Sequence, residues 1–561
     1  MPHIKPLFRS SPLSTPTINY YDWLLRRPEL KSWSDFTLHI DAVTGEQRQA
    51  RAVLERFEHA ATALATSPRD GGLGLLSGRR EVVGILGENC LEYPVLVFAL
   101  LKLAVPVALL PSQSTLQETV ELLKLSSVTY LFASEQLYPH AAAAAKTIGL
   151  PEERIFILQG DVTGKVSLPN LIDDVKVRGL PKIATRPVQD DTLAYLMFSS
   201  GTTGLPKAVM VSHRNIIFST SQLGGINEEI AKVYTIAEHR ENSHSFGSLT
   251  LHVNHSPPLE SWPDREDIFQ VTICSSHNIT TRLIRATFKI PDYAFHDVHS
   301  YMRPAGAAHL PPELRVAFER RAKNLPFFFE GYGLSECTYA ALVLPFPGTC
   351  GGRVNPVRGM TGILCPSLEA RILREDGSDA DYNEIGELIL RGPTIALGYW
   401  KNEKATKETF KDGWLYTGDR FYVDRQGRFF YVDRGKDTFK VSGKQVSPTE
   451  IENTIREHPS QLIIDVAVAG VKGERWSSEL VPRAWVVLSN TGKAQGVEAV
   501  LAALDEWARL RLSKHKWLRG GLQVVDEIPR LPTGKILRRK LQDEYARSDH
   551  GPIQTKPLAK L

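Results

Sequence analysis

Between about residues 50 and 190, apolar residues at helical spacing alternate with short runs that are apolar throughout. Residues 50–65 carry apolar side chains along one helical face, which predicts an amphipathic helix. The short apolar run 81–86 predicts a buried strand. The same two patterns then follow in turn as a helix, a strand, a helix and a strand over 93–103, 105–110, 115–125 and 128–133. This alternation is typical of parallel sheets covered by helices, so we expect an α/β fold.

Composition narrows the class of protein. At 561 residues the chain is too long for a single hydrophobic core, so several subdomains are expected. A hydrophobic content of 42% with 23% charged residues rules out wholesale disorder, and a net charge of +4 without a basic block gives no indication of nucleic-acid binding. Five scattered cysteines without metal-ligand spacing fit a reducing compartment.

No segment resembles a secretion signal or a membrane span. The N-terminus has no apolar core of the signal-peptide kind. The longest apolar run, 95–111, is shorter than a bilayer-spanning helix and contains Lys102 and Pro106. We therefore interpret it as a buried helix that continues into a strand.

A candidate phosphate loop follows the apolar run 193–198, which predicts a strand. Its residues are small, hydroxylated or basic: Ser199, Ser200, Gly201, Thr202, Thr203, Gly204 and Lys207. Backbone N–H groups, hydroxyls and a lysine together suit polyphosphate oxygens. The order differs from the G-x-x-x-x-G-K-[ST] loop, because Lys207 follows Pro206 and precedes Ala208. A plain surface turn is the alternative. Residues 207–213 predict a further strand.

Other segments further along the chain suggest chemistry or local structure. Asp419 is the last residue of the segment 413–419 and is expected at the end of a strand, where its two oxygens could accept from both hydroxyls of a ribose. The alternative for Asp419 and Arg434 is a surface ion pair. Residues 422–429 are typical of a hairpin. Further on, Ser447 is expected to cap a helix that begins at Pro448, with Glu450 placed for a capping box.

Together these segments resemble the adenylate-forming superfamily, which includes acyl-CoA synthetases, luciferases and peptide-synthetase adenylation domains. The resemblance covers about 50–225 and 305–545, and the residues around Lys207, Glu336 and Asp419 are most similar to 4-coumarate:CoA ligases. It implies an N-terminal AMP-binding domain (1–433) of parallel sheets flanked by helices with a small β-barrel. A hinge (434–436) and a small mobile α+β domain (437–561) would follow.

The resemblance also implies site residues. Besides the loop, ATP or AMP would contact Gly306, Ala307, Ala308, Glu330, Gly331, Tyr332, Gly333, Ser335, Asp419, Arg434 and Gln445. Tyr332 would stack on adenine, while Glu336 and Thr202 would hold Mg²⁺. The implied catalytic residues are Lys535, His244 and Lys440. Ser442 and Gly443 would contact CoA, and Lys436 would be the hinge residue.

The interval 226–303 matches the family poorly. His244-Ser245-Phe246-Gly247 is the only fragment in this interval that resembles the family's pattern around its pocket histidine. The polar residues 238–243 stand where the family has an apolar strand. His244 could equally be an ordinary loop histidine. The interval is either a diverged acyl pocket or an error in the gene model.

Three functions remain open from the sequence. The first is an ATP- and CoA-dependent ligase for an aryl or medium- to long-chain fatty acid. The second is an enzyme that passes acyl-AMP to a carrier protein, and the third is an inactive nucleotide-binding relative. The C-terminal Ala559-Lys560-Leu561 is close to the S-K-L address, so we expect a peroxisomal import receptor as a partner and a peroxisomal rather than cytoplasmic location. A frayed tail without a signal is the alternative.

Overall fold

The fold is described from a computed structural model. The residues it describes are 4–7, 17–26, 35–41, 44–75, 81–200, 206–233, 305–306, 329–357, 359–374, 376–434, 439–442, 444–473, 480–529, 536 and 538–547. The chain folds as two compact units that separate after Lys436, with Met1–Ser199 and Pro206–Lys436 in a first unit and Asp437–Leu561 in a second. The hinge function of 434–436 stays a prediction, and each unit is described by itself.

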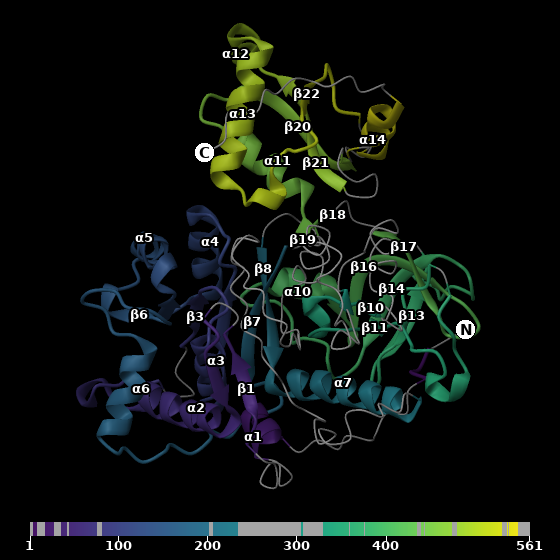
Figure 1. The fold of residues 1–561 in the computed structure, drawn as a ribbon. Helices are drawn as coiled ribbons and strands as arrows, with labels where there is room; N and C mark the ends of the chain where they lie inside the picture. The colour runs from purple at the N-terminus through teal and green to yellow at the C-terminus, as the bar shows by residue number, and fades with distance from the viewer. Residues whose placement is uncertain are drawn as a thin grey trace, which may run out of the picture. The chain divides into compact units, whose positions relative to one another are not determined.

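A six-stranded sheet in the order β6-β5-β3-β4-β7-β8 organises the first part of unit 1 (Figure 1). The pairs β3·β4, β3·β5, β4·β7 and β5·β6 are parallel, as the alternating pattern predicted. The strands are β3 (Val83–Leu86), β4 (Val107–Leu110), β5 (Tyr130–Ala133), β6 (Ile155–Ile157), β7 (Leu193–Ser200) and β8 (Pro206–Ser212).

Helices cover both faces of this sheet, because successive strand residues are apolar and point to opposite sides. Val83 and Val107 pack on one face with α2, α3 and α6, while Leu86 and Ala108 pack on the other with α4 and α5. The helices are α2 (Ala50–Ala65), α3 (Glu92–Lys102), α4 (Leu116–Ser126), α5 (Tyr138–Ile148) and α6 (Leu168–Val177). The helix and strand predictions over 50–133 are confirmed to within a few residues, and the run 95–111 is indeed a buried helix followed by a strand.

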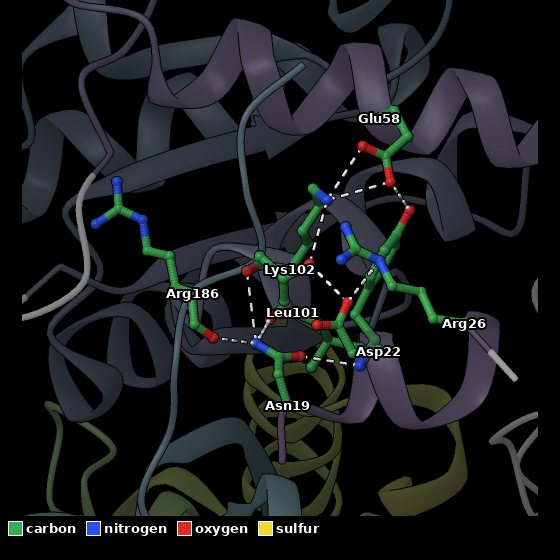
Figure 2. Close-up of polar contacts among 9 residues, drawn as sticks. Asn19, Asp22, Arg26, Glu58, Leu101, Lys102 and Arg186 are labelled. Carbon is green, nitrogen blue, oxygen red and sulfur yellow. Dashed lines mark hydrogen bonds and ion pairs between the residues drawn. The ribbon is translucent and has the colours of Figure 1, made fainter.

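The N-terminal segment is tied to this core by buried polar groups (Figure 2). The Asn19 side-chain amide donates to the carbonyl of Leu101 at 2.9 Å and to that of Arg186 at 3.0 Å. Lys102, fully buried at the end of α3, forms an ion pair with Glu58 of α2 at 3.1 Å. A short helix, α1 (Tyr20–Leu25), and a two-stranded ribbon of β1 (Thr37–Ile40) and β2 (Gln47–Gln49) complete this region.

The strand predicted over 207–213 ends one residue early, because His213 begins α7 (His213–Val233) rather than ending the strand. The change of structure has a local cause: the Ser212 hydroxyl accepts from the Asn215 backbone N–H, and the Asn215 side chain accepts from the Ser212 N–H. This reciprocal pair satisfies N–H groups that the first turn of a helix leaves without partners.

Two smaller sheets complete unit 1. One has the order β12-β11-β10-β9, and the other has the order β13-β14-β16-β15 with β17 also paired to β16. The first contains β9 (Ala305–Gly306), β10 (Phe329–Tyr332), β11 (Leu342–Val343) and β12 (Ile363–Leu364). The second contains β13 (Glu369–Leu373), β14 (Gly386–Arg391), β15 (Phe410–Lys411), β16 (Trp414–Val423) and β17 (Phe429–Arg434), with α10 (Glu403–Thr409) before β15. The predicted hairpin at 422–429 is confirmed by the antiparallel pairing of β16 with β17.

Unit 2 has a three-stranded sheet, β20-β21-β22, covered on both faces. Val468 packs with α11 and α13, and its neighbour Ala467 packs with α14. The elements are β18 (Phe439–Val441), β19 (Lys444–Val446), α11 (Pro448–Arg456), β20 (Ile463–Lys472), β21 (Leu480–Leu488), α12 (Asn490–Gln495), α13 (Val497–Arg511), β22 (Leu522–Val524) and α14 (Arg538–Arg547).

At the start of α11 the predicted Ser447 cap is confirmed, but the predicted capping box is wrong. The Ser447 hydroxyl accepts from the Glu450 N–H at 3.5 Å, with Pro448 as the first helical residue. The expected capping box does not form, because the Glu450 carboxylate pairs with Lys516 at 2.7 Å. Across the described parts of both units, no helix combines the length and the apolar composition needed to cross a bilayer.

Candidate nucleotide site

Glu336 is held at the centre of the site by two hydroxyl groups. It lies in the short 3₁₀ turn Ser335–Cys337 that follows β10, and it is buried. The Ser199 hydroxyl, near the end of β7, donates to Glu336 Oε1 at 3.0 Å. The Tyr399 hydroxyl donates to the same oxygen at 2.9 Å. Three segments far apart in sequence therefore meet at one carboxylate oxygen.

Lys207 is brought to the same place by β8, of which it is the second residue. Its side chain is 7% exposed, and its Nζ lies 4.7 Å from the centroid of the Tyr399 ring. A cation above an aromatic face is attracted by the ring quadrupole. The structure thus joins the predicted phosphate lysine and the predicted metal ligand through a shared tyrosine.

Asp419 and Tyr332 form a second polar pair. Tyr332, at the end of β10, donates its hydroxyl to Asp419 Oδ2 at 2.7 Å and packs edge-on against Phe421. Asp419 is buried and lies directly opposite Arg434 in the β16·β17 pairing. The expectation that Asp419 ends a strand is wrong. It lies inside β16, because β14 pairs with this strand on one side while β15 and then β17 pair with it on the other.

The turn after β10 requires glycine. A Cβ built on Gly333 would lie 1.8 Å from the Tyr339 carbonyl oxygen, closer than any side chain tolerates. The turn is closed by Cys337, whose thiol is buried and accepts from the Leu334 N–H at 3.4 Å. Burial raises the pKa of this thiol to about 11, so it stays protonated at neutral pH.

β9 brings the predicted adenine turn beside β10. The two strands are parallel, and Gly306 pairs with Glu330 in their register. Gly331 and Tyr332 continue β10 into an antiparallel pairing with β11. The backbone of Gly306 therefore lies next to the segment that carries Tyr332. Their contact with one nucleotide stays a prediction.

Other predicted residues lie in unit 2 or outside the described residues. Lys440 is exposed and pairs with Gln445 in the β18·β19 hairpin, and Ser442 forms its turn at a φ of 49°. The positions outside the described residues are Gly201, Thr202, Thr203, Gly204, His244, Ala307, Ala308, Lys436, Gly443 and Lys535. The side chains of Ser200, Glu330, Arg434 and Gln445 are also outside them.

Two residues that contribute to the site were not predicted. Tyr399 lies in the fragment Gly398-Tyr399-Trp400, for which we predicted no role. Asn215 donates from its side chain to the carbonyls of Pro393 and Ile395 at 2.8 and 2.9 Å. The spacing Ser212-x-x-Asn215 at a helix start was the available signal for Asn215.

These features agree with comparisons to known proteins. The family described as AMP-binding enzyme matches residues 52–400. The chain belongs to the AMP-binding enzyme family. Its fold is similar to that of the amide bond synthetase McbA from Marinactinospora thermotolerans, with a TM-score of 0.72 at 19% identity over 94% of this chain and all of that one. The expected fold class is thereby confirmed.

Two curated relatives of this AMP-binding enzyme extend over nearly its whole length. A Dictyostelium discoideum protein named "Probable 4-coumarate--CoA ligase 1" is 29% identical over 92% of this chain and 93% of its own. A luciferin 4-monooxygenase from Nipponoluciola cruciata is 31% identical over 93% and 92%. The resemblance inferred from the motifs is confirmed, and the relatives' different names leave the acid substrate undefined.

Proposed function

We propose that this AMP-binding enzyme joins a carboxylic acid to CoA at the expense of ATP, giving acyl-CoA, AMP and pyrophosphate. The observation that carries the proposal is the convergence of Ser199, Lys207 and Glu336, with the Tyr332–Asp419 pair on neighbouring segments of the same unit. A basic group, hydroxyls and carboxylates in this arrangement suit the phosphates and the ribose of one nucleotide.

The reaction would proceed in two displacements. The carboxylate oxygen of the acid attacks the α-phosphorus of ATP, the bond to the β-phosphate oxygen breaks, and pyrophosphate leaves. The thiol of CoA then attacks the acyl carbonyl, its proton passes to a base or to water, and AMP leaves. Because charge moves among phosphoryl oxygens in the first displacement, positive groups placed around them supply most of the catalysis.

Residues of this chain are assigned to these steps. Lys207, Thr202 and Thr203 hold the departing pyrophosphate, Asp419 and Arg434 hold the ribose, and Tyr332 stacks on adenine. Lys535 provides the charge for the first displacement, and rotation of residues 437–561 about 434–436 withdraws it for the second. His244 and Lys440 serve catalysis, and Ser442 and Gly443 contact CoA.

The described residues fit a magnesium ion at Glu336. Mg²⁺ prefers oxygen ligands and is commonly bound by one or two carboxylates together with substrate phosphates. Glu336 offers a buried carboxylate whose Oε1 is fixed by two hydroxyls. The Thr202 hydroxyl is assigned as a second protein ligand. When bound, the ion would neutralise phosphate charge, while the residues above orient the nucleotide.

Substitution of Lys535 tests the assignment. Lys535→Ala should lower acid-dependent pyrophosphate release about 10²–10³-fold, because one charge aimed at the reacting phosphate is lost. Thioester formation from supplied acyl-AMP should be spared. The matched control is Lys540→Ala, which removes a lysine of α14 that is 60% exposed. Undiminished pyrophosphate release by Lys535→Ala would contradict the assignment.

The acid and the acceptor are tested by substrate panels. Aryl and medium- to long-chain fatty acids are the proposed substrates, so cinnamic, benzoic and fatty acids should differ in pyrophosphate release. Free CoA is the proposed acceptor. Release that occurs without acyl-CoA formation would favour transfer to a carrier protein. ATP binding without any acid-dependent release would favour an inactive relative.

The proposed location is the peroxisome. A fluorescent fusion ending in Ala559-Lys560-Leu561 should be imported, and the same fusion without these three residues should stay in the cytoplasm. Import of the shortened fusion would show that the tail is not the signal.

A further inference from the structure

One backbone segment, Pro393–Trp400, connects the strand of the phosphate lysine to the turn of the metal carboxylate. Three of its main-chain hydrogen bonds go to β8: Leu397 N–H to Met210 O, Met210 N–H to Gly398 O, and Trp400 N–H to Ala208 O, at 2.8–2.9 Å. On the other side, the Ala396 N–H donates to the Glu336 carbonyl at 2.9 Å. Backbone hydrogen bonds therefore hold this segment to β8 on one side and to the turn of Glu336 on the other.

Tyr399 extends from this segment into the space between those neighbours. The side chain is 5% exposed, and Phe410 packs edge-on against its ring at 5.6 Å. Its hydroxyl reaches Glu336 Oε1 at 2.9 Å, and its ring faces the Lys207 ammonium at 4.7 Å. A single rigid side chain thus touches both charged groups that the proposed reaction assigns to phosphates and metal.

The direction of the hydrogen bonds matters for the carboxylate. Tyr399 and Ser199 each donate to Oε1. Within the described residues, no hydrogen bond reaches Oε2. Two donors on one oxygen fix the rotation of the carboxylate and leave the other oxygen for a further ligand. Groups that hydrogen-bond a metal ligand in this way orient it and commonly change metal affinity 10–100-fold.

We propose that Tyr399 is a positioning residue for the nucleotide–metal site. Its hydroxyl sets the orientation of the Glu336 carboxylate toward the ion, and its ring sets the position of Lys207. This inference rests on the proposed function, because it concerns the ion and the phosphates of that reaction. The two parts of the side chain have different roles: the hydroxyl orients the carboxylate that binds the metal, and the ring positions the lysine that binds the phosphates.

Tyr399→Phe separates these two roles, since it removes the hydroxyl and keeps the ring. The probe is Mn²⁺ titrated into the enzyme with a non-hydrolysable ATP analogue and followed by electron paramagnetic resonance. We expect the apparent dissociation constant for Mn²⁺ to rise about 10–100-fold. The Mg²⁺ concentration needed for half-maximal pyrophosphate release should rise in parallel. Metal-free AMP binding, the KM for the acid and the thermal midpoint should change little.

Two further variants keep the test decisive. Tyr422→Phe is the matched control, because that ring stacks on Phe430 and lies outside the site; its metal binding should equal wild type. Ser199→Ala removes the other donor to Oε1 and should weaken Mn²⁺ binding in the same direction as Tyr399→Phe. It tests whether donors to Oε1 control metal binding, and Tyr399→Phe decides the role of Tyr399 itself.

The outcomes distinguish this inference from the proposed function. If Tyr399→Phe and Ser199→Ala bind Mn²⁺ as wild type does, the positioning role is wrong while the ligase function stands. If the wild-type protein binds neither the ATP analogue nor Mn²⁺ with it, the proposed function is wrong. A loss of metal-free AMP binding equal to the loss of Mn²⁺ binding would show a general structural role and overturn the inference.

Discussion

His213 makes the stability of unit 1 sensitive to acid. It is the first residue of α7 and is 1% exposed. Its Nδ1 accepts a hydrogen bond from the Tyr20 backbone N–H at 3.2 Å, so this nitrogen carries no proton. The ring proton is then on Nε2, which is buried and has no hydrogen-bond partner in the described structure. Burial lowers the pKa of His213 from 6.5 to about 4.

The size of the effect follows from this difference in pKa. A histidine that is harder to protonate in the folded state stabilises the fold fully above its unfolded pKa of 6.5, and the contribution is lost as the pH falls toward 4. A shift of about 2.5 pKa units is worth about 3 kcal/mol in total, of which about 2.5 kcal/mol should disappear between about pH 7.5 and pH 4.5. Protonation would also remove the Nδ1 acceptor and release the N-terminal segment at Tyr20.

The comparison is between wild type and His213→Asn, whose side-chain oxygen can still accept from Tyr20 but cannot titrate. Urea unfolding at a series of pH values gives the free energy of unfolding, and hydrogen exchange of the peptide that contains Tyr20 gives the local opening. We expect wild type to lose about 2–3 kcal/mol more than the variant as the pH falls to about 4.5. Equal pH slopes for the two proteins would refute this reasoning, because other titrating groups are common to both.

Three further substitutions test contacts described above. Lys102→Met should lower the free energy of unfolding by about 3 kcal/mol, since it leaves Glu58 without its buried partner, and Lys102→Met with Glu58→Leu should recover part of the loss in the same urea assay. Asn215→Ala should cost about 2 kcal/mol in thermal unfolding, because two partly buried carbonyls lose their donor. A cost below about 0.5 kcal/mol would show that water replaces the amide. Gly333→Ala should abolish AMP binding measured by calorimetry, since its Cβ would collide with the Tyr339 carbonyl. Normal AMP affinity in that variant would show that the turn can shift at little cost.

Much of the fold could be predicted because its central strands are apolar on both faces. β3 and β4 are apolar runs of four residues between helical patterns, and this short length favours a buried strand over a helix. Strand β16 shows why boundaries were harder to predict. Its polar residues Thr417 and Asp419 are buried. The strand continues through an irregularity in its pairing with β14, where the side chains of Glu387 and Thr417 accept from the backbone N–H groups of Gly418 and Asp419.

Site residues could be predicted only where a short local sequence is enough to recognise them. Glu336 and Lys207 were identified from local strings, and the structure brings them to one tyrosine. The role of Tyr399 depends on a partner 63 residues away, and the pairing of Lys102 with Glu58 spans 44 residues. Neither distance is encoded in local periodicity, so a lysine that interrupts an apolar run gave no indication of its buried partner.

The hydrogen bonds of Pro393–Trp400 with β8 also have a consequence for synthesis on the ribosome. β8 is an edge strand of the six-stranded sheet. Backbone groups on its outer side pair with the segment Pro393–Trp400, which is synthesised about 190 residues later. At about 5–20 residues per second, that edge stays open for roughly 10–40 s after it leaves the ribosome. An unpaired edge can template pairing with another chain, so the nascent protein should depend on chaperones most during this interval. Slowing translation between these two segments should lower the yield of soluble protein more than slowing it after residue 400.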